Sequence, residues 1–250
     1  MTDRSISESD RPWLLTRVTL KRDAAAAALA PILLPGGRDA PMPLATGHRL
    51  MWSLFADAPE RRRDFLWREI EPGRFLTYSA RPPSHHGDLF HIDEPKPLDV
   101  PWRVGQRLAF SLRANPTVAR RRGDGSRASR RRDVVMEGLY PLDSGAARRD
   151  ARAGLERTQG LDWLTARAES RGFALDRATD GTPRVTVDGY RRHRVGRRGG
   201  GQAVLSSLDF DGLLTITDPA AFAAALRQGI GPAKAFGFGL LLVRPAPPGA

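Results

Sequence analysis

One histidine and one glycine-rich basic loop are the parts of this sequence that predict chemistry. His48 lies in a helix candidate directly before Arg49, and histidine is the side chain that exchanges protons near neutral pH. The loop covers residues 229–239 (GIGPAKAFGFG) and carries Lys234 as a point charge. Glycines let a backbone approach a ligand closely and turn its N–H groups toward an anion. Those of the loop are Gly229, Gly231, Gly237 and Gly239. In a basic chain such a loop points to a nucleic-acid backbone.

The loop differs from two familiar phosphate-binding motifs. It follows a helix candidate and precedes a strand, which is the reverse of the order in a dinucleotide fingerprint. It also lacks the Gly-Lys-Ser/Thr ending of a P-loop. The alternative interpretation of the loop is a tight structural connection without a ligand. The alternative interpretation of His48 is an ordinary helix residue without a catalytic role.

Two further groups of residues raise the question of a metal site. Asp209 and Asp211 alternate on a strand and could hold a magnesium ion, but Gly212 favours a strand-end turn. The histidines at 85, 86 and 91 have a spacing that matches no familiar ligand pattern, which favours a solvated loop. We therefore expect no metal and no other cofactor.

The charge of the chain is strongly basic and unevenly distributed. The net charge is +12, with 37 Arg against 3 Lys. Residues 1–115 have a net charge of +3 and residues 116–250 a net charge of +9. Arginine forks onto phosphates and stacks on bases, so a polyanionic partner, RNA above all, is the leading prediction. The candidate RNA-binding side chains of the second half are Arg120, Arg121, Arg122, Arg130, Arg131, Arg132, Arg191, Arg192, Arg194, Arg197 and Arg198.

Composition excludes several classes of protein. The 250 residues include 40% hydrophobic residues, enough for a folded core, and no cysteine, which excludes disulfides and thiol catalysis. No apolar run reaches the roughly 20 residues that span a bilayer, so no membrane partner is expected. The polar start of the chain does not have the pattern of a signal peptide, and we expect a cytoplasmic protein.

The order of the predicted elements is similar in the two halves. Each half reads approximately as strand, helix, strand, strand, helix and strand, the order of a ferredoxin-like domain. In the first half we expect strands at 13–21, 65–70, 75–79 and 107–114, a helix at 44–56 and a connection over 82–101. In the second we expect strands at 134–139, 184–196, 202–210, 213–217 and 240–243, with helices at 161–171 and 219–227. Asp218 and Pro219 predict the start of the last helix.

The sequence thus predicts an α+β protein of two tandem ferredoxin-like (RRM-like) domains with antiparallel sheets. Residues 1–11 are expected to be a polar extension, 12–115 the first domain with His48, and 116–250 the second domain. The arginine-rich stretch 116–133 reads as a loop that marks the boundary.

Several motifs in one order resemble the CasE (Cse3) family of CRISPR-RNA endoribonucleases from type I-E Cascade complexes. The resemblance extends from Trp13 to Val243. The motifs are WLLTRVTL from residue 13, HRLMWSLF from 48, FLWRE from 65, LRANP from 112, DWL from 162 and GIGPAKAFGFGLLLV from 229. LRANP followed by the glycine-rich loop is specific as a pair.

The resemblance implies cleavage of the CRISPR repeat, without a metal, at the 3′ base of its hairpin. It places the helix histidine of the family at His48, and Ala45 and Ser53 at positions where some relatives have tyrosine and lysine. The product would be a 2′,3′-cyclic phosphate and a 5′-OH, and the protein would then stay bound beside other Cascade subunits. Phosphate-stabilising candidates are Arg49, Arg113 and Lys234. The alternatives are a non-catalytic RNA-binding subunit of this fold and, far behind, a metal-dependent nuclease.

Overall fold

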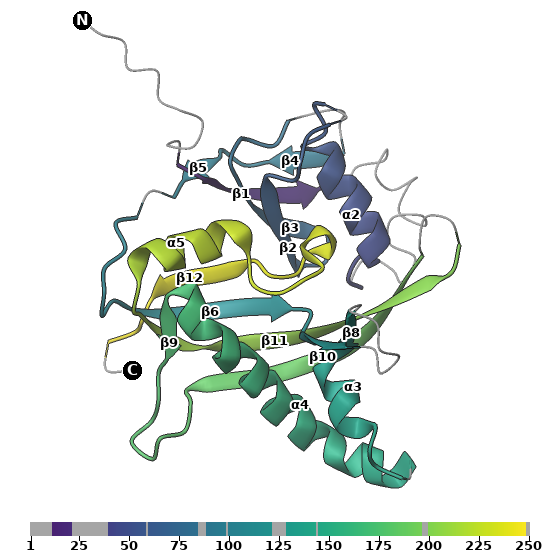
Figure 1. Cartoon of the computed structure of the whole chain (residues 1–250). Coiled ribbons are helices and arrows are strands. Elements are labelled where there is room, and N and C mark those ends of the chain that lie inside the picture. The colour runs from purple at the N-terminus through teal and green to yellow at the C-terminus, as the bar shows by residue number, and fades with distance from the viewer. Residues whose placement is uncertain are drawn as a thin grey trace, which may run out of the picture. The chain divides into compact units, whose positions relative to one another are not determined.

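The chain forms two compact units in a computed structural model (Figure 1). The structure describes residues 12–21, 40–58, 60–84, 89–98, 100–121, 129–143, 145–196 and 200–248. Unit 1 contains Met1–Pro101 together with Ala235–Gly237, and unit 2 contains Trp102–Lys234 and Phe238–Ala250. Three residues of the glycine-rich loop therefore belong to unit 1.

Unit 1 is an antiparallel sheet with one described helix. Its elements are β1 (Leu14–Leu20), α2 (Leu44–Ser53), β2 (Phe65–Glu71), β3 (Arg74–Ser79), β4 (Phe90–Ile92) and β5 (Lys96–Pro97). The strand order is β2-β3-β1-β4, with β5 also paired to β1. This is the antiparallel pairing of a ferredoxin-like domain, in which the first strand lies between the third and the last. The connection 82–101 therefore contains two short strands.

The core of unit 1 lies between this sheet and α2. Phe55 and Phe65 stack with their ring centroids 4.1 Å apart, and Val18 and Met51 are fully buried. Residues of alternating burial along β1 give the sheet one apolar face, as a strand of period two requires. Gly73 takes the left-handed conformation (φ +73°) that the predicted turn between β2 and β3 needs.

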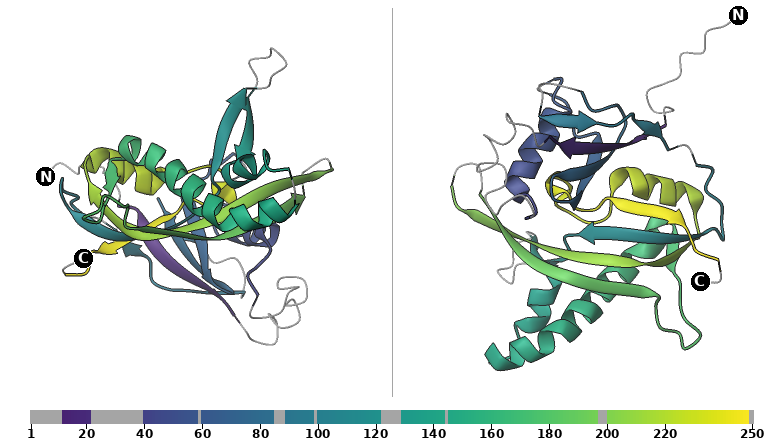
Figure 2. Two further views of the ribbon diagram at one scale, coloured as in Figure 1. Left: turned by 90° about the horizontal axis from the view of Figure 1, so that it is seen from below. Right: turned by 180° about the vertical axis from the view of Figure 1, so that it is seen from behind.

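Unit 2 repeats the same architecture with additions (Figure 2). Its strands are β6 (Arg107–Ala114), β9 (Phe173–Leu175), β10 (Val185–Gly196), β11 (Gln202–Ile216) and β12 (Leu241–Pro245), in the order β10-β11-β6-β12 with β9 paired to β11. Its helices are α3 (Val134–Leu139), α4 (Gly145–Ala168) and α5 (Pro219–Gln228), with a 3-10 turn at Glu169–Arg171. A second 3-10 turn, Lys234–Phe236, begins at the last residue before the segment that belongs to unit 1. β7 (Thr117–Arg121) and β8 (Ser129–Asp133) form a separate two-stranded sheet.

The prediction of two ferredoxin-like, antiparallel α+β domains is confirmed. The strand Arg107–Ala114, expected in the first half, pairs with β11 and β12. The compact units accordingly divide between Pro101 and Trp102. The last helix begins as expected, because the Asp218 carboxylate accepts hydrogen bonds from the N–H groups of Ala220 and Ala221.

The predicted loop over 116–133 is wrong in its described part. Thr117–Arg121 and Ser129–Asp133 pair as antiparallel strands, because backbone pairing with polar side chains on both faces needs no apolar core. Residues 122–128 lie outside the described residues. We call the paired segment, β7 with β8, the basic arm.

The predicted strand at 134–139 is wrong as well, because it is helix α3. The Asp133 carboxylate caps it by accepting the N–H groups of Val135 and Met136, which overrides the β-branched composition of the segment.

The expected strand-end turn at Gly212 is also wrong. The two strands predicted on either side of it are one strand, β11. Gly212 lies inside that strand, where a Cβ atom would come within 2.4 Å of the Arg184 carbonyl oxygen. The glycine is thus explained by a close backbone approach.

None of the helices in the described ranges is long and apolar enough to cross a membrane.

Candidate functional site

Helix α2 positions His48 within unit 1. The helix begins after Pro43, whose carbonyl accepts the N–H groups of Thr46 and Gly47. Gly47 and Met51 are on its buried face, while Arg49 is exposed. His48 lies between these environments and is half-buried. A side chain at such a position can be held by the protein on one side and meet a ligand on the other.

The hydrogen bond of the His48 ring determines which nitrogen carries the proton. Nδ1 lies 2.9 Å from the carbonyl oxygen of Ala235. A carbonyl only accepts, so Nδ1 must donate, and the neutral ring keeps its lone pair on Nε2. Nε2 is therefore the atom through which His48 can take up or release a proton. The sequence predicted the histidine but not this tautomer.

Aromatic rings surround the same imidazole. Phe236 lies with its ring centroid 5.2 Å from that of His48, and Trp52 lies at 6.1 Å in an edge-on arrangement. The Ala235 carbonyl also accepts the indole Nε1–H of Trp67 at 3.2 Å. Ring packing and this shared carbonyl fix the plane of the imidazole.

Two glycines form a slot for the Trp67 ring. A Cβ atom on Gly47 would lie 2.7 Å from the indole, and one on Gly237 would lie 2.9 Å from it. Gly237 also has a φ of +82°, which disfavours any other residue. One glycine of the predicted loop is thus required by packing beside His48.

The amides of two other loop glycines face the protein and not an anion. Gly229 donates its N–H to the Ala225 carbonyl, and Gly239 donates to the Arg113 carbonyl. The expectation that these two N–H groups turn toward a phosphate is therefore wrong, because they close the end of α5 and extend the sheet. Gly231 packs on the Trp163 indole, where a Cβ atom would lie 2.9 Å from the ring.

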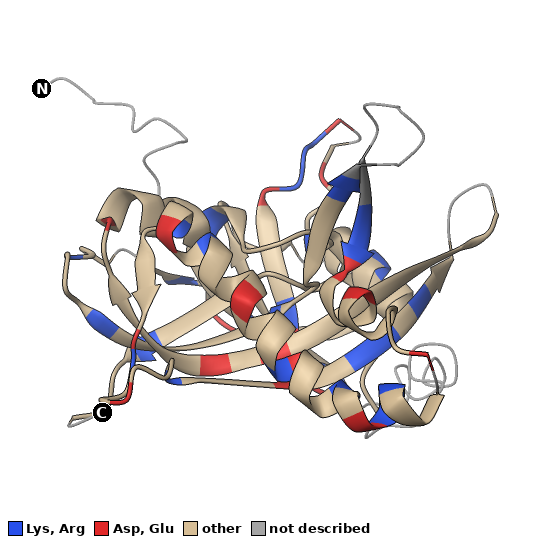
Figure 3. Cartoon of the chain, turned by 60° about the horizontal axis from the view of Figure 1, so that its bottom comes forward, with Lys and Arg blue, Asp and Glu red and all other residues tan. Residues whose placement is uncertain are grey.

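The described arginines among those predicted in unit 2 lie on the basic arm and on β10. Arg131 and Arg132 on β8, and Arg191, Arg192 and Arg194 on β10, are exposed. Arg120 on β7 pairs with Glu137 of α3 at 2.7 Å. Figure 3 shows Lys and Arg along the basic arm and along β10. The side chains of Arg121 and Arg130, and all of Arg122, Arg197 and Arg198, lie outside the described residues.

The basic arm is anchored at its base, a feature that the sequence analysis missed. Thr117 and Asp133 are partners in the register of β7 and β8. The Thr117 carbonyl accepts the Trp163 indole N–H at 3.1 Å and an Arg167 N–H at 3.2 Å. On the other strand the Tyr190 hydroxyl donates to the Asp133 carboxylate at 2.6 Å. The arm therefore leaves the domain from a fixed base.

The phenol of Tyr190 stays a hydrogen-bond donor at this anchor. Burial raises its pKa first, and the adjacent Asp133 carboxylate raises it further. The phenol therefore keeps its proton, and its hydrogen bond to Asp133, to a higher pH than an unperturbed tyrosine would.

Arg113 and Asp209 form a bidentate ion pair between β6 and β11. Nε and Nη2 of Arg113 lie 2.7 and 2.8 Å from the two carboxylate oxygens. Both oxygens of Asp209 therefore face a guanidinium group, and the guanidinium lies along the sheet. No group of three or more His, Asp or Glu residues in the described ranges is arranged to hold a metal ion. Residues 85–88 lie outside those ranges, and His91 is an exposed residue of β4.

His193 is expected to make the stability of the chain depend on pH. Its half-buried ring lies on β10 with Nε2 3.0 Å from the Ser207 hydroxyl. Burial, and then the charges of Arg113 and Arg191, lower its pKa below 6.5. The unfolded chain therefore binds this proton more readily than the folded chain. The free energy of unfolding should fall as the pH drops from about 6.5 toward the lower pKa of the folded state, and should not respond to this group above 6.5.

Urea unfolding of the wild type and of His193→Gln at a series of pH values measures this effect. Glutamine can keep the contact with Ser207 but does not titrate, so the loss of stability on acidification should be smaller in the variant. Equal losses in the two proteins would contradict the assignment to His193.

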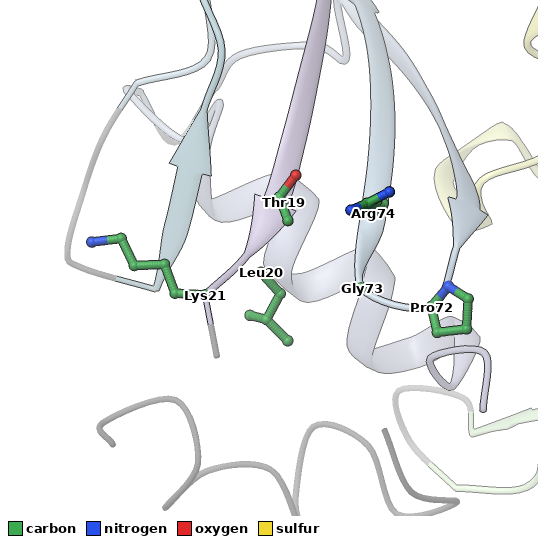
Figure 4. A pocket seen from close by; sticks show the side chains of 6 residues that line it. All are labelled: Thr19, Leu20, Lys21, Pro72, Gly73 and Arg74. Carbon is green, nitrogen blue, oxygen red and sulfur yellow. The ribbon is translucent and has the colours of Figure 1, made fainter. Parts of the chain in front are cut away.

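A cavity of about 350 Å³ lies elsewhere in unit 1 (Figure 4). Its lining comes from the end of β1 and the turn between β2 and β3, namely Thr19, Leu20, Lys21, Pro72, Gly73 and Arg74. This lining contains neither a histidine nor a carboxylate. His48 is not among the residues that line it, so this cavity is separate from the candidate site.

The fold and the His48 site together define a two-domain ferredoxin-like protein with one candidate proton-transfer centre. The family described as CRISPR associated protein matches residues 13–245. The CRISPR-associated endoribonuclease Cse3 of Thermus thermophilus is 31% identical over 86% of this chain and 97% of that protein. The CRISPR system Cascade subunit CasE of Escherichia coli is 28% identical over 79% of this chain and 90% of that protein.

A solved structure extends the similarity to three dimensions. Thermus thermophilus Cse3 bound to an RNA that represents a pre-cleavage complex is similar with a TM-score of 0.63 and 27% identity, covering 94% of this chain and all of that one. The chain belongs to the CasE (Cse3) family of CRISPR-associated proteins.

Proposed function

We propose that the protein is an endoribonuclease that binds the CRISPR repeat hairpin and cleaves it at the 3′ base without a metal. The support is the family membership, the name endoribonuclease of the Thermus relative, and the solved pre-cleavage RNA complex. The E. coli relative is a Cascade subunit, so we also propose that this protein keeps its product and binds other Cascade subunits. Its place of action would be the cytoplasm.

The observation that carries the proposal is the bond from His48 Nδ1 to the Ala235 carbonyl. RNA contains its own nucleophile, so the enzyme needs to align the 2′-OH, move protons and stabilise charge. The O2′–P bond forms while the P–O5′ bond breaks. Neutral Nε2 of His48 can accept the 2′-OH proton, or the protonated ring can give its Nε2 proton to the leaving O5′. In the first role the leaving O5′ takes its proton from water, and in the second the 2′-OH gives its proton to water, so that either role yields a 2′,3′-cyclic phosphate and a 5′-OH.

Charge on the phosphate would be stabilised by a neighbouring cation. Arg49 is exposed and adjacent to His48 in α2, and Lys234 directly precedes Ala235 in the chain. Arg49 is preferred over Arg113, whose guanidinium group holds Asp209, and Lys234 stays a candidate. Ser53 is a poor substitute for a lysine because its hydroxyl donates to the Leu50 carbonyl.

RNA binding would use the basic arm and β10. Duplex RNA hides its base edges in a deep major groove, so contacts to its shape and backbone dominate recognition. The exposed arginines of β8 and β10 supply the charge for such contacts. Glycines of the terminal loop, Gly229, Gly231, Gly237 and Gly239, would shape the backbone near the site.

Cleavage of a labelled repeat hairpin in EDTA tests the proposed function. We expect one cut at the 3′ base with a cyclic-phosphate end, and no cut when the ribose at the scissile position is 2′-deoxy. The deoxy hairpin should bind normally, since only the nucleophile is missing. Binding without cleavage would favour the non-catalytic RNA-binding subunit instead, and activity only after addition of magnesium would favour a metal-dependent nuclease.

A further inference from the structure

We propose that Trp67 is a positioning residue for His48 that acts through the Ala235 carbonyl. The inference rests on the proposed function, because positioning matters only if His48 transfers a proton. Trp67 itself is 3% exposed and belongs to the core of unit 1. A residue buried to this degree does not meet RNA, so any effect on cleavage must pass through its neighbours.

The connection between Trp67 and His48 is a single oxygen atom. The Ala235 carbonyl accepts His48 Nδ1–H at 2.9 Å and Trp67 Nε1–H at 3.2 Å. A carbonyl oxygen has two lone pairs, and here each faces one donor. The indole donor holds the carbonyl in the direction that the imidazole needs.

The two glycines make this connection rigid. The Trp67 ring packs against Gly47, the residue directly before His48, and against Gly237, two residues after Ala235. One ring therefore sets the distance between helix α2 and the segment that supplies the carbonyl. Both ends of the His48 hydrogen bond are located by the same side chain.

Loss of the indole N–H should let His48 populate both neutral tautomers instead of the Nδ1–H form alone. Without a second donor the carbonyl can turn away, and a histidine that lacks a fixed partner on one nitrogen populates both neutral tautomers. Molecules with the proton on Nε2 could not accept a proton there. The expected result is a slower chemical step with unchanged hairpin affinity.

The test compares Trp67→Phe with Trp13→Phe. Phenylalanine keeps a ring in the glycine slot but has no N–H. Trp13 belongs to the same unit but packs on Tyr78, with the ring centroids 5.0 Å apart, so Trp13→Phe removes an indole N–H without changing the rings that pack on His48. Nitrogen-15 NMR of the histidines in the RNA-free protein reads the tautomer, and the His48 signal is identified by its disappearance in His48→Asn. Single-turnover cleavage and hairpin binding are measured in parallel.

Support requires three results together. Wild-type His48 shows the Nδ1–H form, Trp67→Phe shifts it toward a mixture, and that variant cleaves about three- to tenfold more slowly at saturating RNA with unchanged affinity, as expected when a single hydrogen bond is removed. Trp13→Phe should keep the wild-type tautomer.

Other results would overturn the inference. A wild-type His48 in the Nε2–H form does so even if Trp67→Phe does not fold. So does an unchanged tautomer in Trp67→Phe, or the same shift in Trp13→Phe. Failure of the proposed function is recognised separately: His48→Ala would then cleave at the wild-type rate, whatever the NMR spectra show.

Discussion

His48→Ala should cleave the repeat hairpin about 10²–10⁴-fold more slowly than the wild type while binding it with the same affinity. The magnitude is that of losing one general acid or base, and the affinity is preserved because the arginines of unit 2 are untouched. Single-turnover cleavage and a binding titration of the same hairpin measure the two quantities. His91→Ala is the matched control, since His91 is an exposed histidine on β4 of the same unit.

A second variant separates chemistry from packing at this position. The side-chain amide of His48→Asn can donate to the Ala235 carbonyl in place of Nδ1–H, but it has no nitrogen that titrates near neutral pH. We expect it to be as inactive as the alanine variant. Substantial cleavage by either variant would remove His48 from the mechanism.

The double variant Arg131→Ala/Arg132→Ala should bind the hairpin about tenfold or more weakly than the wild type. Both side chains are exposed on β8 of the basic arm. Removing an arginine that neutralises a phosphate should lower the slope of log affinity against log salt by about one. Titrations at several salt concentrations give the affinity and the slope together. The rate at saturating RNA should not change.

The control for this variant removes the same charge elsewhere in unit 2. Arg103 and Arg177 are exposed and lie outside the basic arm and β10. If Arg103→Ala/Arg177→Ala weakened binding equally, the effect would come from net charge and not from the arm.

Local signals in the sequence are enough to predict a helix or strand when the residues that start it are neighbours in the chain. Helix α5 is the clearest case, because Asp218 and Pro219 are adjacent to the turn that they stabilise. Asp133 gives the same kind of signal, but the β-branched residues after it favour a strand, and the prediction there is wrong. The sequence places β6 in the first half, but β6 pairs with strands of unit 2. Its partners come about 100 residues later (β11) and about 130 residues later (β12), beyond the range of any local pattern.

The candidate site also depends on contacts between residues that lie far apart in the sequence. His48 could be selected because histidine is the residue type suited to proton transfer and because its motif resembles a family. Its partner could not, because Ala235 is 187 residues away and contributes a backbone oxygen, which every residue has. Trp67 is 168 residues from the carbonyl that it holds, and in the sequence it is only an apolar strand residue.

The fixed base of the basic arm has a consequence for how such proteins can diverge. The hydrogen bonds from Trp163, Arg167 and Tyr190 reach the arm at one pair of facing residues, Thr117 and Asp133. Apart from the Arg120–Glu137 ion pair, the described contacts that hold the arm to the domain involve these two positions, so exposed arm positions such as Arg131 and Arg132 can be exchanged without removing the anchor. If the arm binds RNA as proposed, RNA preference could change through exposed arm residues while the fold of unit 1 stays the same.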